Sequence, residues 1–466
     1  MEMPMNDNVT CHEPTTVRRL ADWINAFAAS PVPAATADRA RLILLDTLSC
    51  ALCAATDDKS ENVIRTVERL SGAGTCTIIG TQLRTSLPLA SFANGVLIRT
   101  LDLNDTYTGP RQIGHPSDNI GAALSTAELA DRSGADLIRA IRMGYEIYGR
   151  ILDLGDPDSP WDHVTVSGIV TAAMTGWLLR LPAERLAHAM ALAACHSATL
   201  GEVRVGHVSA AKSIANSVVV QTASLMTLLA AEGMTGPGEA IEGARGYAKL
   251  IMNGANFSDF FQNGNNADRL MAVGLKQYPC FALGQGPISA AVELGKQIAS
   301  PADIQRLKVT VADTGAARLR LRDSLGRVPS SQEAADHSVY FLVAVALLDG
   351  RFGLDQLTGG RWRDPDVRSL IERMEAAIDP ALKPATALPC RLETTLANGK
   401  TLVVERKVTP GNPAMPLTWD EVEDKFRRCA SGVIGKSAQA TVIESVARIE
   451  ALPSVRTLLA ALVPAR

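Results

Sequence analysis

The sequence predicts a mainly α protein, with a large all-α helical bundle and a smaller α+β part. Two observations predict this fold class. From Thr16 to about residue 233, apolar residues recur at helical spacings of three and four in one segment after another. After about residue 275, segments with alternating apolar residues lie between helical ones. Because 466 residues exceed one ordinary core, we expect two domains or one large helical assembly.

The helical part is predicted to begin near Thr16 with the segment VRRLADWINAFA. Residues Thr36–Arg39 then cap a second helix, ARLILLDTLSCALCAA, which is apolar nearly all round and is therefore expected near the centre. The short segment TCTIIGT predicts a strand or an extended loop. A further helix, LASFANGVLIRTLDLND, is expected to deliver Asp102 at its C-terminal end.

Five helices rich in alanine and glycine are expected next, and such small residues let helices pack closely. They are IGAALSTAELADRSG, ADLIRAIRMGYEIYGRILDL, VSGIVTAAMTGWLLRL, PAERLAHAMALAACHSAT and SAAKSIANSVVVQTASLMTLLAAEG. Pro182 in a first turn and Gly233 just past a helix end follow the usual preferences of helix termini. This part therefore predicts a tightly packed bundle whose walls can support a cavity.

The remaining third of the chain predicts a small α+β domain. ADIQRLKVTVAD alternates like a strand, with Leu307, Val309 and Val311 on one face. CRLETTLANGKTLVVERKV predicts a hairpin whose two-residue turn is Asn398 and Gly399. The segments DHSVYFLVAVALLDG and DPDVRSLIERMEAAI between them are expected to be helical, as are the final segments LTWDEVEDKFRRCASG and SAQATVIESVARIEALPSVRTLLAAL.

The composition excludes several function classes. A net charge of −3, with acidic and basic residues interleaved, gives no electrostatic footprint for nucleic acid or anionic lipid. Charged residues interrupt each long apolar stretch, so no membrane span is expected. The first sixteen residues are polar and lack the order of a signal peptide, which predicts a cytoplasmic protein.

The eight cysteines are scattered along the chain and are mostly flanked by apolar residues, which is typical of reduced, buried thiols. Cys50 and Cys53 form a CxxC pair inside an apolar helical pattern. No second pair and no neighbouring histidine accompanies them, so we interpret them as core residues rather than as a metal or redox site.

The densest reactive chemistry lies in the segment LDLNDTYTGPRQIGHPSD, residues 101–118. Its prolines and glycines predict a loop that joins two helices and holds polar groups against rigid walls. An alternative interpretation is an exposed turn in which Ser117 or Asp118 caps the helix that begins near Ile120. The candidate side chains of the loop are Asp102, Asp105, Thr106, His115, Ser117 and Asp118.

His115 and His163 are the candidates for acid and base, because histidine titrates near neutrality. His163, just before a helix start, could instead cap that helix or lie on the surface. The remaining histidines carry other expectations. His188 and His196 should be packed or exposed, His337 should cap or support a helix, His207 near Lys212 stays open, and His12 lies in the terminal segment.

Lys212 and Lys276 are the candidates for binding an anion. Lys212 lies at the beginning of a helix, where the helix dipole also favours an acidic substrate. For either lysine the alternative is a surface side chain. Arg204 is a weaker addition, and no Walker loop, dinucleotide fingerprint or zinc spacing is present in the sequence.

Several motifs together resemble one known family. Asp102-Leu103-Asn104-Asp105-Thr106, followed by Gly114-His115-Pro116-Ser117-Asp118-Asn119, resembles the signature of the MmgE/PrpD family. That family contains 2-methylcitrate dehydratases, cis-aconitate decarboxylase and an iminodisuccinate epimerase. Further matching pieces follow in order: Trp161–Val164, Arg204–Gly206 running to Lys212, Lys276–Cys280, and Asp336–Ser338 leading to Leu348–Gly350.

The resemblance implies the domain organisation. In this family the C-terminal tail folds back onto the bundle, which leaves an α+β lid between the two parts of the helical domain. We therefore expect helical residues 1–272, a lid over residues 273–412, and a helical return over residues 413–466. A homodimer is also expected by similarity to the family.

The resemblance also implies a chemistry, since the family acts on di- and tricarboxylates through a carbanion next to a carboxylate. The expected reaction is a dehydration of a 2-methylcitrate-like hydroxy-polycarboxylate that needs neither a metal nor an organic cofactor. A decarboxylase of a cis-aconitate-like acid, or an epimerase, is the alternative on the same fold. A non-catalytic protein that binds a small acid is the second alternative.

Within that reaction we expect His115 to remove the carbon-bound proton and His163 to protonate the departing hydroxyl. Asp102 would orient a histidine. Lys212 is the fourth residue expected to be catalytic, with His115, His163 and Asp102. The residues expected to bind substrate are Thr106, Asp118, Arg204, Lys276 and Tyr340.

Two departures from the family pattern concern the lid. Phe281 and Leu283 occupy the positions where family members usually carry a histidine after the lysine-proline motif. Phe341 occupies the position at which the decarboxylase carries a tyrosine, although Tyr340 is adjacent. The HPSD sequence around Asp118 and the WDHV sequence around His163 resemble the dehydratases more closely. A less polar lid suggests a substrate with fewer carboxylates or an added alkyl group.

Overall fold

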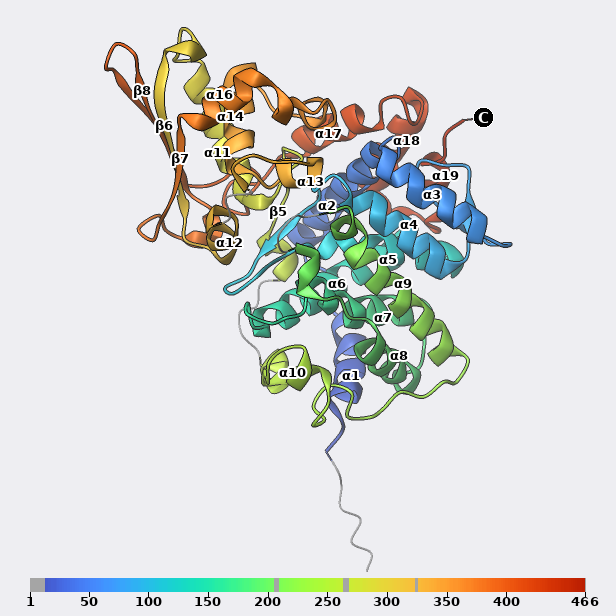
Figure 1. Ribbon diagram of the computed structural model, residues 1–466. Helices are drawn as coiled ribbons and strands as arrows, with labels where there is room; N and C mark the ends of the chain where they lie inside the picture. Colours follow the sequence, from blue (N-terminus) through green and yellow to red (C-terminus); the bar gives the residue numbers. More distant parts are fainter. Residues whose placement is uncertain (1–12, 205–208, 263–267, 323–325, 466) are drawn as a thin grey trace, which may run out of the picture.

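The structure is a computed structural model that describes residues 13–204, 209–262, 268–322 and 326–465. Helices dominate it, and the few strands form small sheets (Figure 1). The prediction of a mainly α protein is therefore confirmed.

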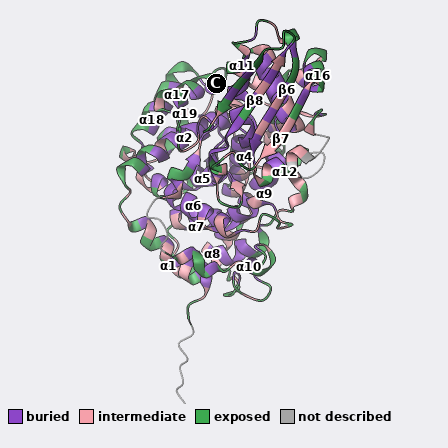
Figure 2. Ribbon diagram, turned by 90° about the vertical axis from the view of Figure 1, so that its left-hand side faces the viewer, coloured by how far each residue is buried: buried purple, intermediate pink, exposed green. Residues whose placement is uncertain are grey.

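The first part of the chain forms a helical bundle, and the C-terminal helices complete it. The buried residues of its hydrophobic core come from residues 17–275 and 417–462. Figure 2 shows the buried parts of the ribbon gathered in the interior. The N-terminal helices are α1 (Thr16–Ala29), α2 (Ala34–Ala54), α3 (Asp58–Leu70), α4 (Leu87–Arg99), α5 (Ile120–Leu129), α6 (Gly134–Leu154), α7 (Ser167–Leu178), α8 (Ala183–His196), α9 (Ala211–Ala231) and α10 (Tyr247–Leu250). The returning helices are α17 (Trp419–Ala430), α18 (Lys436–Ala447) and α19 (Arg456–Ala461), of which α17 packs on α2.

Two helix ends differ from the prediction. Helix α2 begins at Ala34, directly after Pro33, and not after a cap at Thr36–Arg39. The Thr36 hydroxyl lies inside the helix and donates to Asp268 Oδ2 (2.7 Å), so it does not cap the helix. Helix α4 ends at Arg99, and Asp102 lies beyond it with a φ of +48°. A turn, and not the last helical turn, therefore presents the Asp102 side chain.

A second hydrophobic core lies around a four-stranded sheet and comes from residues 280–404. The strand order is β7-β6-β8-β9, with β7 parallel and β8 antiparallel to β6. Helices α11 (Ala282–Gly295) and α14 (Val339–Asp349) pack on each other beside this sheet. The strands are β6 (Ile304–Ala312), β7 (Met374–Asp379), β8 (Cys390–Leu396) and β9 (Thr401–Arg406), and the other helices are α12 (Gly315–Arg322), α13 (Gln332–Ala335), α15 (Leu354–Thr358) and α16 (Pro365–Glu372).

The sheet confirms one prediction and corrects two. Leu307, Val309 and Val311 are all buried on one face of β6, as the alternation indicated. The segment that was expected to be helical up to Ile378 instead becomes β7 at Met374, because pairing with β6 outweighs local helix propensity. In the β8–β9 hairpin only Gly399 has a positive φ (+77°), so the turn is a three-residue loop over residues 397–399.

A small sheet connects the polar loop to the end of the bundle sequence. Its strands are β3 (Thr106–Thr108), β4 (Ile113–Gly114) and β5 (Val273–Gly274), in the order β4-β3-β5. The loop over residues 101–118 therefore does join two helices, as predicted, and it contains the β3–β4 hairpin. Since β5 pairs with β3, Lys276 is brought next to the loop. The predicted short strand near residue 76 is β1 (Cys76–Thr77), which pairs with β2 (Arg84–Thr85).

Helix α9 is long and apolar enough to cross a membrane by length and composition alone. Its uncharged run from Ser213 to Ala231 corrects the expectation that a charge interrupts every long stretch. Half of the apolar window is buried inside the protein, where α9 packs against α4, α7 and α8. A core helix of a bundle passes the same test, so this helix does not indicate insertion into a membrane.

Gly134 allows the C-terminal return to dock on the start of α6. A Cβ built on Gly134 would lie 1.8 Å from the Ile449 carbonyl oxygen. We predict that Gly134→Ala lowers the free energy of unfolding by about 1–3 kcal/mol, because the clash must be relieved by moving backbone. Gly72→Ala is the control, since a Cβ there meets nothing within 4 Å. Equal urea denaturation midpoints for the two variants would contradict this prediction.

Candidate active site

The centre of the site is the buried carboxylate of Asp102, which three cationic side chains contact. Its Oδ1 accepts hydrogen bonds from Arg99 Nη1 (2.7 Å) and Lys276 Nζ (2.5 Å), and its Oδ2 accepts one from Lys212 Nζ (2.8 Å). Burial alone would raise the pKa of Asp102, but the charges of Arg99, Lys212 and Lys276 lower it well below its ordinary value. Asp102 is therefore ionised.

The two lysines reach Asp102 from distant parts of the chain, whereas Arg99 lies three residues before it. Arg99 lies in the last turn of α4, Lys212 in the first turn of α9, and Lys276 just after β5. Both lysines are buried, with exposures of 4% for Lys212 and 2% for Lys276, so neither is the surface side chain of the alternative interpretation. Burial lowers the pKa of Lys212 to about 8, although the charge of Asp102 opposes this shift.

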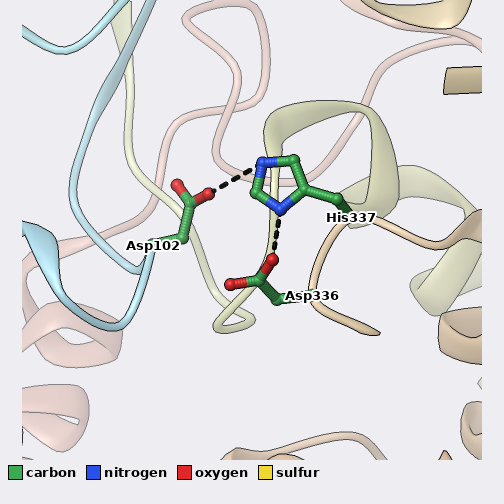
Figure 3. Close-up of side chains that lie close together, drawn as sticks. All are labelled: Asp102, Asp336 and His337. Carbon is green, nitrogen blue, oxygen red and sulfur yellow. Dashed lines mark hydrogen bonds and ion pairs between the residues drawn. The ribbon is translucent and has the colours of Figure 1, made fainter. Parts of the chain in front are cut away.

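His337 belongs to this cluster, which corrects the prediction that it caps or supports a helix. Its Nε2 lies 3.0 Å from Lys212 Nζ and 3.4 Å from Asp102 Oδ2, and its Nδ1 contacts the Asp336 carboxylate (Figure 3). The capping group of α14 is Ser338, whose hydroxyl accepts from the Phe341 backbone N–H (3.2 Å). The sequence signal was the Asp-His pair directly before the helix.

The protonation of His337 follows from its neighbours. Burial and the charge of Lys212 lower the pKa of His337 to about 4, so the imidazole is neutral near pH 7. With Nδ1–H donating to the Asp336 carboxylate, Nε2 accepts from the Lys212 ammonium. The α+β part of the chain therefore contributes an imidazole that fixes the direction of Lys212.

His115 is oriented by a backbone carbonyl, and the histidine beside Asp102 is His337. His115 Nδ1 lies 2.6 Å from the backbone carbonyl oxygen of Asp105 and not beside Asp102. A carbonyl only accepts, so Nδ1 carries the proton and Nε2 carries the lone pair. Burial, together with the charges of Arg99 and Lys276, lowers the pKa of His115 well below its ordinary value. His115 is therefore a neutral imidazole with a free basic nitrogen.

His163 is the second imidazole, and its ring centroid lies 5.9 Å from that of His115. Its Nδ1 is 3.3 Å from Asp162 Oδ1, while Arg204 contacts the other oxygen of that carboxylate. Burial lowers the pKa of His163 to about 3, and the charge of Asp162 opposes this shift. The helix cap is Asp162, which accepts from the Val164 backbone N–H (3.0 Å), so His163 does not have the capping role of the alternative interpretation.

A buried hydrogen-bond network underlies the two imidazoles and rules out the exposed capped turn. The Asp105 carboxylate accepts from the Ser117 hydroxyl (2.6 Å) and the Tyr145 hydroxyl (2.7 Å). Asn104 Nδ2 donates to Ser117 Oγ (2.9 Å) and to Asp118 Oδ1 (2.8 Å). Burial raises the pKa of Asp118 to about 7 and that of Asp105 to about 6. The loop is thus a rigid wall of the site.

The remaining predicted residues divide into two groups. Arg204 contacts the Asp162 carboxylate that lies beside His163, and Thr106 lies on β3, directly after the Asp105 carbonyl that bonds His115. Among the described residues no hydrogen bond joins Tyr340 to the Asp102 cluster, and its ring lies 5.4 Å from the guanidinium of Arg327. The predictions for the other histidines are confirmed for His188, half-buried, and His196, exposed, whereas His12 and His207 lie outside the described residues.

Buried polar atoms without a hydrogen-bond partner gather around the loop. Such atoms are costly unless something satisfies them, so a group of them indicates the place of a polar ligand. The space beside His163 measures about 20 Å³, which holds roughly one water molecule. The unpartnered atoms here are Arg99 Nε, Thr106 Oγ1, Asp118 Oδ2, His163 Nε2, Arg204 Nη2 and Asn216 Oδ1.

Asp102, Asp336 and His337 are also the one group of three potential metal ligands among the residues that the structure describes. Arg99, Lys212 and Lys276 already hold the Asp102 oxygens, so a dication there would face three charges of its own sign. The donor set therefore suits a carboxylate-cation cluster and not a metal centre.

Comparison with known proteins identifies the family. A model of the MmgE/PrpD N-terminal domain matches residues 18–259, and one of the MmgE/PrpD C-terminal domain matches residues 278–451. These matches cover most of the chain. The chain therefore belongs to the MmgE/PrpD family.

The curated relatives include two kinds of enzyme. The chain is 29% identical over 457 residues to a 2-methylcitrate dehydratase of Cupriavidus necator, covering 89% of this chain and 91% of that protein. It is 28% identical to the 2-methylcitrate dehydratase of Escherichia coli, covering 74% of each. It is 23% identical to the cis-aconitate decarboxylase of Mus musculus, covering 89% of this chain and 86% of that protein. These relatives support a lyase-type enzyme.

The electrostatics of the cluster can be tested in the ligand-free protein. We predict that Asp102→Asn lowers the pKa of Lys212 further below about 8, because the carboxylate that favours the ammonium form is gone. An NMR titration of the Lys212 side chain measures this, with the exposed Asp420→Asn as control. An unchanged titration in Asp102→Asn would show that Asp102 does not set the charge of Lys212.

Proposed function

We propose that this protein is a cofactor-independent lyase that dehydrates a 2-methylcitrate-like hydroxy-polycarboxylate. The observation that carries the proposal is the pair of neutral imidazoles of His115 and His163, 5.9 Å apart, in the field of the cation cluster at Asp102. Removing a proton next to a carboxylate places a second negative charge on that carboxylate. Buried cations stabilise that charge in the transition state.

The hydrogen bonds of the imidazoles favour different roles for them. His115 has no carboxylate on its ring, and its free Nε2 suits the base that removes the carbon-bound proton. His163 has the Asp162 carboxylate beside its ring, which favours the imidazolium once a negatively charged substrate adds its own field. His163 is accordingly the acid that protonates the departing hydroxyl.

The cation cluster keeps a net positive charge that can bind a substrate carboxylate. The carboxylates of Asp102 and Asp336 offset two of the three charges of Arg99, Lys212 and Lys276, and His337 is neutral near pH 7, so one positive charge remains. Because Lys212 lies in the first turn of α9, the helix dipole adds to the positive field. In this proposal the two lysines bind substrate carboxylates, while Thr106 and Arg204 offer the unpartnered atoms Oγ1 and Nη2 to substrate oxygens.

One apolar feature of the lid supports a substrate with an alkyl group. The Phe281 ring stacks on His337 at 5.1 Å and thereby adds an apolar surface to the polar cluster. Phe341, in contrast, is fully buried in the second core and offers no group to the site. The higher identity of the dehydratase relatives, 29% and 28% against 23% for the decarboxylase, also favours dehydration over decarboxylation.

Assays of the purified protein against citrate, 2-methylcitrate, cis-aconitate and iminodisuccinate, with products identified by NMR, separate the candidate reactions. Dehydration of a hydroxy-acid produces a conjugated double bond and a rise in ultraviolet absorbance. Release of carbon dioxide from cis-aconitate, or racemisation without dehydration, would favour the decarboxylase or epimerase. Binding without turnover of any acid would favour a binding protein and contradict the proposal.

His163→Ala is expected to lower kcat by about 100-fold or more, because it removes the acid that assists departure of the hydroxyl. His196→Ala is the matched control, since His196 is exposed at the end of α8. Circular dichroism and thermal unfolding confirm that both variants fold. Near-native turnover by folded His163→Ala would rule out this assignment.

The charge of Lys212 predicts the alkaline side of the pH profile. Since its pKa is lowered to about 8, the ammonium form is present below that pH and is lost as pH rises through it. We expect kcat/KM to fall above about pH 8, and Lys212→Arg to lack this limb because its guanidinium stays charged. Rate measurements with the accepted acid across the alkaline range test this, and a flat wild-type profile would exclude Lys212 as the titrating group.

A further inference from the structure

Lys425 of α17 lies behind the Asp102 cluster, in the part of the chain that returns to the bundle. Its ammonium is buried, with 4% of the residue exposed. Nζ donates to Asp46 Oδ1 (2.7 Å), to the Leu103 carbonyl oxygen (3.0 Å) and to the Lys276 carbonyl oxygen (2.9 Å). An ammonium has three donors, and each of them has a defined acceptor here.

Two of these acceptors belong to the chain segments that carry the site. Leu103 directly follows Asp102, whose backbone has the left-handed φ of +48°. Lys276 is itself the residue whose Nζ donates to the Asp102 carboxylate and carbonyl. Lys425 thus bonds the main chain of two segments, 173 residues apart in the sequence, at the point where their side chains meet.

The third acceptor keeps the ammonium charged inside the protein. Burial alone would lower the pKa of Lys425, but the charge of Asp46 on α2 raises it above its ordinary value. A charged donor forms stronger hydrogen bonds to carbonyl oxygens than a neutral one does. Asp46 therefore holds Lys425 in the form that binds both carbonyls firmly.

We propose that Lys425 is a positioning residue. Its hydrogen bonds to the main chain at Leu103 and Lys276 keep the Asp102 carboxylate and the Lys276 ammonium in contact. The C-terminal return then completes the active site from behind as well as covering the bundle core. The consequence for turnover rests on the proposed function, whereas the consequence for geometry does not.

The test replaces the ion pair as a whole, because Lys425→Gln alone would leave Asp46 buried without its partner. The double variant Asp46→Asn/Lys425→Gln removes both charges of this ion pair, but the shorter, neutral amide has only two N–H donors for the three acceptors. The matched control is Arg142→Gln/Asp268→Asn, a buried ion pair of the same bundle with a 3.0 Å contact. Arg142 otherwise bonds Ser30 and the Pro31 carbonyl, and neither is a site residue.

Three readouts are compared for the wild type and both double variants: thermal unfolding, kcat/KM with the accepted acid, and the crystal structure. We expect both variants to lose stability. Asp46→Asn/Lys425→Gln alone should lose about 100-fold in kcat/KM, the size of effect that a displacement of about 1 Å produces. Its Lys276 Nζ to Asp102 Oδ1 contact, 2.5 Å in the native protein, should be broken, and the NMR titration of Lys212 should shift.

A folded double variant that retains the Lys276–Asp102 contact overturns the proposal, whatever its turnover. If the variant does not fold, Lys425→Arg provides the same test, because a planar guanidinium keeps the charge but cannot direct its donors to the same three acceptors. If the wild type turns over no acid, the proposed function fails, and the crystal structure of the variant still decides the role of Lys425.

Discussion

One buried carboxylate held by three cations is the interaction on which the rest of the structure depends. Asp102 is 2% exposed, and its oxygens contact Arg99, Lys212 and Lys276. Burying four charges is costly unless each one is paired and hydrogen-bonded. The fold meets that condition with a short turn after α4, the first turn of α9, and a strand pairing that brings Lys276 beside the loop.

The same cluster explains why two parts of the chain must meet on the bundle. The α+β part adds the Asp336–His337 pair, which fixes Lys212, and the C-terminal return adds Lys425, which bonds the main chain at Leu103 and Lys276. The two imidazoles of His115 and His163 lie in this field, and their low pKa values follow from burial together with nearby cations. Charge, hydrogen bonding and acid-base chemistry therefore belong to one arrangement.

The sequence was informative where chemistry is dense or periodicity is strong. His115, Asp102 and Lys212 could be predicted because local motifs bring reactive groups together or place them at a helix start. His337 and Lys425 could not, since their roles depend on contacts between segments more than one hundred residues apart. The prediction of a helix was wrong from Met374 onward, because this segment pairs with β6 as strand β7.

A crystal structure of the protein with 2-methylcitrate bound tests the central claim most directly. The account predicts substrate carboxylates on Lys212 and Lys276, with the carbon that loses its proton facing His115 Nε2 and the hydroxyl facing His163. A ligand bound away from the Asp102 cluster, or one whose reacting carbon faces neither imidazole, would contradict it.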